Sequence, residues 1–172
     1  MLKLLGSGLI FTASIGLAFH IRRDLEGHLR LLYEIRKMLT DISYAASESM
    51  QPVEILLGCF VRMRDERLNE ACKEIAEALI ERREENGEEV WKKAFELRRK
   101  TLGLYSEEAE IVEGAGSAFF GKSVEENRKH LQYSLERLDF IITHAREGQK
   151  EKQRVAQTVS VAGGLVLILL LL

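Results

Sequence analysis

A chain of 172 residues has room for one domain of ordinary size, and its 25 Lys and Arg residues nearly balance its 27 Asp and Glu residues. These charges are unevenly placed, because only Lys3 lies before His20 and none follows Arg154. The distribution excludes an ordinary soluble globule, and one proline and two cysteines exclude a collagen-like chain and a disulfide scaffold. A net charge of −2 provides no basic field, so no nucleic-acid partner is expected.

The two ends of the chain are apolar and almost free of charge. Residues 2–19 and 155–172 each form a stretch of 18 residues, which is about 27 Å long as a helix and near the short end of a membrane span. The sequence therefore predicts an N-terminal transmembrane helix at 1–20, a cytoplasmic helical domain at 21–154 and a C-terminal transmembrane helix at 155–172.

The topology follows from the basic residues beside the two predicted spans. Arg22 and Arg23 follow the first span, and Lys150, Lys152 and Arg154 precede the second. Because basic flanks stay on the cytoplasmic side, we expect a protein of the cell membrane with two spans and with the middle of the chain in the cytoplasm. Cys59 and Cys72 agree with a reducing compartment, since they are far from CxxC spacing, and each is expected to be a small buried apolar residue.

Two features of the first apolar stretch leave alternatives open. Gly16-Leu17-Ala18 resembles a small-residue cleavage site, so the stretch could be a cleaved signal peptide, although the arginines that follow favour a stop-transfer flank. Gly8, Thr12 and Gly16 repeat every four residues, a spacing that lets helices approach closely in a membrane. Whether the chain forms a homo-oligomer through this row of small residues is therefore a second open question.

The middle of the chain has the apolar periodicity of helices, with polar punctuation between them. The expected N-caps of the last two helices are Ser106 and Ser123, and Asn86-Gly87 is expected to end the third helix. The predicted helices cover, in chain order, residues 24–47, 53–63, 68 to about 87, 88–100, 106–120 and 124–172. The fourth helix is expected to end before Gly103, and its apolar residues are Val90, Trp91, Ala94, Phe95 and Leu97. The last helix is expected to place on one face Val124, Leu131, Leu135, Leu138, Ile142 and Ala145. We therefore predict an all-α fold, a helical bundle of about five to six helices flanked by N- and C-terminal transmembrane helices; a coiled coil with a partner is the alternative.

One segment matches a catalytic motif letter for letter. Gly116-Ser117-Ala118-Phe119-Phe120-Gly121-Lys122-Ser123 fits GxxxxGK[ST], in which backbone amides cradle phosphates and the lysine reaches the β- and γ-phosphates. A phosphate-binding loop joins a buried strand to a helix, whereas residues 107–113 are a charged amphipathic stretch typical of a helix. We expect the segment to be a helix end and a turn, with a nucleotide-binding protein as the alternative function.

No other pattern indicates chemistry. His20, His28, His130 and His144 lack the spacing of metal ligands, and no set of side chains has the spacing of a nucleophile with its base. The basic run Arg98-Arg99-Lys100, with Lys92 and Lys93, could meet anionic lipid or an acidic partner, but a solvated helix face explains it as well. We predict no enzyme activity, no catalytic residue, no cofactor and no metal.

The order of these parts resembles the stage III sporulation protein AB family over nearly the whole chain. The residues that carry the resemblance are Arg22-Arg23 after the first span, Asp41 to Tyr44, Gln51 to Leu56, Gly116 to Gly121 with Ser123 and Glu125, Leu135 to Leu138, Lys152 and Gly164.

The resemblance implies a structural part of the channel complex between mother cell and forespore. Members of the family look like the cytoplasmic domains of type II secretion F platform proteins. The implied partners are a secretion-type ATPase, the sporulation AA protein, and other membrane proteins of the channel. The implied location is the mother-cell membrane around the forespore, with the helical domain in the mother-cell cytoplasm.

Overall fold

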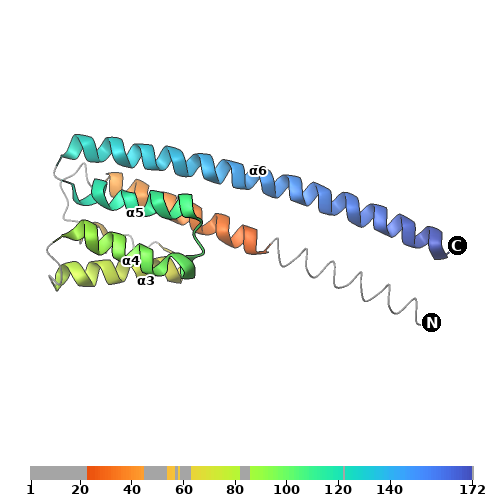
Figure 1. Cartoon of the computed structure of the whole chain (residues 1–172), viewed down its shortest axis with the longest axis horizontal. Helices are drawn as coiled ribbons and strands as arrows, with labels where there is room; N and C mark the ends of the chain where they lie inside the picture. Colours follow the sequence, from red (N-terminus) through yellow and green to blue (C-terminus); the bar gives the residue numbers. More distant parts are fainter. Residues whose placement is uncertain are drawn as a thin grey trace. The chain divides into compact units, whose positions relative to one another are not determined.

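The computed structural model describes residues 23–44, 54–56, 58, 63–81, 86–121 and 123–171, except for the side chains of Val124 and of most residues beyond Glu151. Every regular element within these ranges is a helix, so the predicted all-α helical bundle is confirmed (Figure 1). One compact unit covers Arg30–Ile142, and a second combines Met1–Leu29 with Thr143–Leu172.

Helices α3 and α4 form an antiparallel hairpin. Helix α3, Glu66–Ile80, begins at the N-cap Asp65, whose carboxylate accepts from the amides of Arg67 and Leu68. Helix α4, Gly87–Leu102, ends at Gly103, whose φ of 73° is the left-handed conformation that glycine adopts without strain. The predicted end of this helix before Gly103 is confirmed.

The prediction for Asn86-Gly87 was wrong, because these residues begin α4 and do not end α3. The side chain of Asn86 accepts a hydrogen bond from the amide of Glu88 at 3.1 Å, which makes it an N-cap. Helix α3 has already ended at Ile80. Asparagine is favoured at both kinds of helix end, so its presence alone did not decide between them.

Helix α5, Ser106–Phe120, has the predicted bounds but a different cap. Ser106 is its first residue, and the carboxylate of Glu108 accepts from the amide of Tyr105 at 2.8 Å. The Ser106 hydroxyl instead accepts from Nη2 of Arg99 at 2.7 Å. The expected Ser106 N-cap is therefore corrected, since this hydroxyl ties α5 to the end of α4.

Helix α6 runs from Val124 to Leu171, and its predicted last residue, Leu172, lies outside the described residues. Leu131, Leu138 and Ile142 are buried on the face that the periodicity predicted. Among the described residues, no helix combines the length and the apolar character needed to cross a bilayer. Residues 2–19, where the first span was predicted, lie outside the described residues, and the division at 1–20, 21–154 and 155–172 stays a prediction.

The core of the Arg30–Ile142 unit lies between helix 23–44 and the helices that follow it. Helix α4 packs against both α3 and α5 (Figure 1), and Cys72 is buried beside Met38 as the small apolar residue that was expected. Large side chains fill the centre without exposure, namely Leu31, Leu32, Ile35, Met38, Leu39, Ile42, Leu56, Leu68, Ile75, Trp91, Phe95 and Leu102. Leu97, predicted on the apolar face of α4, is 70% exposed instead.

Candidate functional site

The first half of the Gly116–Ser123 motif is part of a helix. Gly116 to Phe120 form the C-terminal end of α5, where backbone amides belong to the helix and are not gathered into a phosphate cradle. A β-carbon on Gly116 would lie 2.5 Å from Cδ1 of Trp91, so the glycine makes room for the indole ring. The nucleotide-binding alternative is not supported, and Lys122 lies outside the described residues.

Gly121 and Ser123, from the second half of the motif, lie between α5 and α6. Nδ2 of Asn127 donates to the carbonyl of Gly121 at 2.8 Å, and a β-carbon on this glycine would clash with the same side chain. The Ser123 hydroxyl accepts from the amide of Glu126 at 3.4 Å, so the predicted Ser123 N-cap is confirmed. The two glycines and the serine of the motif therefore serve packing and capping.

An aromatic cluster joins α4 to α5 beneath this turn. The Trp91 ring centroid lies 4.9 Å from that of Phe95 and 5.7 Å from that of Phe119, and Phe120 is 4.7 Å from Phe119. Nε1 of Trp91 donates to the carbonyl of Val112 at 2.7 Å. Burial, edge-on ring contacts and a satisfied N–H hold the two helices in one arrangement.

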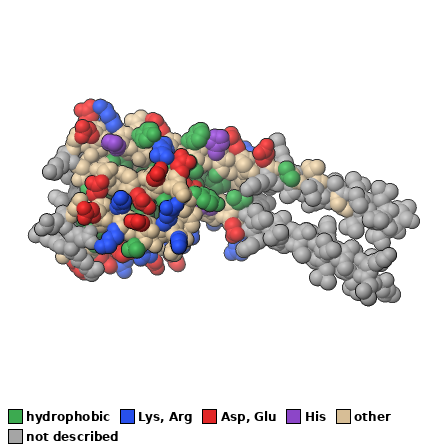
Figure 2. Space-filling view, in the orientation of Figure 1, with side chains coloured by type: hydrophobic (Ala, Val, Ile, Leu, Met, Phe, Trp, Pro, Cys, Tyr) green, Lys and Arg blue, Asp and Glu red, His purple; other side chains and the backbone are tan. Residues whose placement is uncertain are grey.

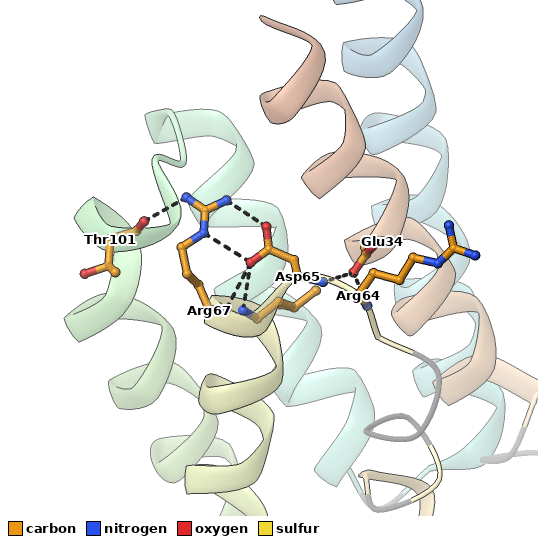
Figure 3. A network of polar contacts seen from close by, with 6 residues as sticks. Glu34, Arg64, Asp65, Arg67 and Thr101 are labelled. Atoms are coloured by element: carbon orange, nitrogen blue, oxygen red, sulfur yellow. Dashed lines mark hydrogen bonds and ion pairs between the residues drawn. The ribbon is translucent and has the colours of Figure 1, made fainter. Parts of the chain in front are cut away.

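A polar network connects helix 23–44, the start of α3 and the end of α4 (Figure 3). The Glu34 carboxylate accepts from the amides of Arg64 at 3.0 Å and Asp65 at 2.8 Å, although about thirty residues separate them in sequence. Arg67 donates to Asp65 at 2.7 Å and to the carbonyl of Thr101 at 3.1 Å. Two carboxylates thus cap one helix N-terminus, where the partial positive charge favours them.

Asp65 has a pKa below its ordinary value. Burial alone would raise this pKa, but the hydrogen bond and charge of Arg67 and the amides of Leu68 and Arg67 outweigh burial. Because the folded pKa is the lower one, the resulting stability is fully present above the unfolded value of about 3.9 and is lost as the pH falls through the folded value.

We expect Asp65→Ala to lower the free energy of unfolding at neutral pH by about 1–2 kcal/mol, because the N-cap and the Arg67 contact are lost. Urea unfolding of the full chain in a mild detergent at a series of pH values measures this difference. It should be constant from about pH 7 to 5 and shrink below about pH 4. Glu66→Ala, an exposed change one residue later, is the control, and a difference that grows on acidification would contradict the assignment.

Arg137 organises the outward surface where α5 and α6 meet. Its Nη2 lies 3.3 Å from Oε1 of Glu107 and 3.9 Å from Oε2 of Glu110. Its Cζ lies 5.9 Å from the centroid of the Tyr133 ring, within cation–π range. One guanidinium therefore faces two carboxylates and an aromatic ring.

Two large aromatic side chains lie on the side of α6 that faces away from the core. Tyr133 is 60% exposed and Phe140 is 64% exposed, while Leu131 and Leu138 are buried. A spacing of seven residues places the two rings on one face, about 10 Å apart along the helix axis. Figure 2 shows hydrophobic side chains among charged ones on the surface over α6.

We call this surface the acidic aromatic face and define it by Glu107, Glu110, Tyr133, Glu136, Arg137 and Phe140. It carries three carboxylates and one guanidinium, so its net charge is negative. Exposed Tyr, Phe and Arg residues are enriched at protein interfaces. Because this surface combines two exposed aromatic rings with an arginine, it is our candidate functional site.

The predicted basic cluster of α4 is partly neutralised inside the chain. Nη1 of Arg98 lies 2.9 Å from Oε2 of Glu70, and its Nε lies 3.0 Å from Oε2 of Glu74. The hydrogen bond that Arg98 donates to Glu74 raises the pKa of Arg98 above its ordinary value, with a smaller contribution from the bond to Glu70. With Arg99 bound to Ser106, these two arginines support the helix junctions, which favours the solvated-face interpretation.

No group of histidine, cysteine, aspartate or glutamate side chains in the described ranges could hold a metal ion. His28, His130 and His144 are therefore in no such group, and His20 lies outside the described residues.

Comparison with known proteins decides the family. The family model for stage III sporulation protein AB matches residues 3–172. The chain belongs to the stage III sporulation protein AB family. A solved structure described as stage III sporulation protein AB (SpoIIIAB) is similar with a TM-score of 0.64 and 14% sequence identity, and the match covers 70% of this chain and 94% of that one. No significant match was found among curated proteins. The resemblance stated from the sequence is confirmed.

The acidic aromatic face was missed by reasoning from the sequence, although one part of it had a signal. Tyr133 and Phe140 are seven residues apart and out of phase with Leu131 and Leu138, which places two rings opposite the buried face. The pairing of Arg137 with α5 had no such signal, because it joins residues thirty positions apart.

Proposed function

We propose that this member of the stage III sporulation protein AB family is a non-enzymatic, membrane-anchored scaffold of the sporulation channel. In this role it links a cytoplasmic secretion-type ATPase, the sporulation AA protein, to membrane components during endospore formation. The observation that carries the proposal is the family match over residues 3–172. The described side chains support it, because their buried polar groups serve helix caps and junctions and their candidate site has the composition of an interface.

The anchors in this proposal are the apolar ends of the chain. Residues 2–19 and 155–172 insert into the mother-cell membrane around the forespore, and the basic flanks keep the helical body in the cytoplasm. Helix α6 runs from Val124 to Leu171, so one helix contains part of the helical body and most of the proposed second anchor.

Affinity capture of the tagged full chain from sporulating cells, solubilised in a mild detergent, tests the role. We expect the AA-type ATPase and channel membrane proteins to be recovered, and we expect deletion of the protein to block sporulation at the channel stage. Capture from cells in vegetative growth is the control. Recovery of no channel component, together with normal sporulation of the deletion strain, would contradict the proposed function.

A further inference from the structure

The acidic aromatic face carries more negative charge than the chain itself neutralises. Arg137 is shared between Glu107 and Glu110, whose side chains are 60% and 76% exposed, and Glu136 adds a third carboxylate next to Tyr133. Lys129, one turn before Tyr133, is matched with Glu125 at 3.3 Å. The excess of carboxylates therefore lies beside the two exposed rings.

The face is held in place before any partner arrives. Arg137 of α6 makes a cation–π contact with Tyr133 and an ion pair with Glu107 of α5. On the opposite side of α6, Leu131 and Leu138 are buried in the core. Side chains that are already ordered lose less conformational entropy on binding, which favours their use as anchors. Aromatic rings that are exposed in a fixed setting are what interface hot spots require.

From this geometry we infer that the acidic aromatic face docks a basic amphipathic helix of another protein. The partner helix would carry Lys or Arg residues that meet Glu107, Glu110 and Glu136. Its apolar residues would lie against Tyr133 and Phe140, two turns apart, which matches an i, i+7 spacing on the partner. The inference rests on the proposed function, because it assigns a surface and a partner chemistry to the scaffold.

Charge decides against the other two occupants. Anionic lipid headgroups would meet three carboxylates and be repelled. A second copy presenting the same face would bring like charges together across a symmetric interface. A basic protein segment gains from both the carboxylates and the electron-rich faces of the rings.

A binding measurement in solution gives the first test. The full chain in detergent micelles is titrated with an amphipathic helical peptide that carries leucines seven residues apart and flanking arginines, and with a second peptide in which glutamate replaces each arginine. We expect the arginine peptide alone to bind, more weakly as salt is raised. Phe140→Ala and Glu110→Gln should each weaken binding about fivefold or more.

Two exposed residues of α4 provide matched controls, since Leu97 is 70% exposed and Glu96 is also exposed. Leu97→Ala and Glu96→Gln should leave the affinity unchanged. Equal loss in the α4 and α6 variants, or equal binding of the two peptides, would overturn the inference. Far-ultraviolet circular dichroism of each variant shows whether the fold is kept.

Cross-linking in sporulating cells gives the second test. A photoreactive benzophenone residue replaces Tyr133 in the full chain, and mass spectrometry identifies the peptide attached to it; the same residue at Leu97 is the control. We expect attachment to a Lys- or Arg-bearing segment of a different protein. Attachment to lipid, to a second copy or to an acidic segment, or no attachment, would overturn the inference. If affinity capture still recovers the ATPase in that case, the scaffold role stands and only the assignment of the surface fails.

Discussion

Replacing Trp91 by alanine should lower the free energy of unfolding by about 3–5 kcal/mol, the range for deleting a buried aromatic side chain. The ring has no solvent exposure and contacts Phe95, Phe119 and Phe120. The variant also loses the hydrogen bond from Nε1 to the carbonyl of Val112. Because the protein as a whole is stabilised by only about 5–15 kcal/mol, this single change removes a large share.

Urea unfolding of the full chain in mild detergent, followed by far-ultraviolet circular dichroism, measures the effect of Trp91→Ala. Leu97→Ala on the same helix is the control and should change the free energy of unfolding by less than about 0.5 kcal/mol, since Leu97 is exposed. Similar losses in both variants would show that the Trp91 cluster is not the structural centre of the α4–α5 pair.

Two alanine substitutions in α5 should act in opposite directions. Gly114 has no atom within 4 Å of an added β-carbon, so Gly114→Ala should stabilise the chain by about 0.5–1 kcal/mol through helix propensity. An alanine at Gly116 would push into Trp91, whose ring packs against Phe95, Phe119 and Phe120. Gly116→Ala should therefore destabilise the chain by about 1–3 kcal/mol, the usual effect of overpacking.

The sign of the difference between these two variants is the informative result. Both remove a glycine from the interior of the same helix, so the change in backbone entropy is common to both. If Gly116→Ala stabilised the chain as much as Gly114→Ala, the glycine would not be needed for packing. The explanation of the GxxxxGK[ST] match as a helix junction would then lose its main support.

Much of the fold could be predicted from local patterns, because helix periodicity and caps are local. The bounds of α5 and the start of α6 agree with the prediction, and Ser123 and Gly103 serve as expected. Asn86 was misplaced because the same residue type favours both ends of a helix. Leu97 was misplaced because the apolar arc of α4 is wide, and only the position of the neighbouring helices decides which edge is covered.

The candidate site was less accessible from the sequence because it depends on contacts between distant segments. Within the site, Arg137 of α6 meets carboxylates on α5, and outside it Glu34 caps α3 from another helix in the same way. Nothing in a single sequence indicates which of its many charges will be brought together. The exposed rings of Tyr133 and Phe140 had a signal in their spacing, but an aromatic residue out of phase is informative only once the buried face is known.

Membrane attachment tests the central claim most directly, because the scaffold role requires the helical body to be held at a bilayer. Cells that produce the full chain are lysed gently without detergent, and the membrane pellet is washed with high salt and then extracted with detergent. We predict that the full-length protein sediments with the membranes, withstands the salt wash and is released by detergent. Recovery of the intact protein in the soluble fraction before detergent is added would contradict the account.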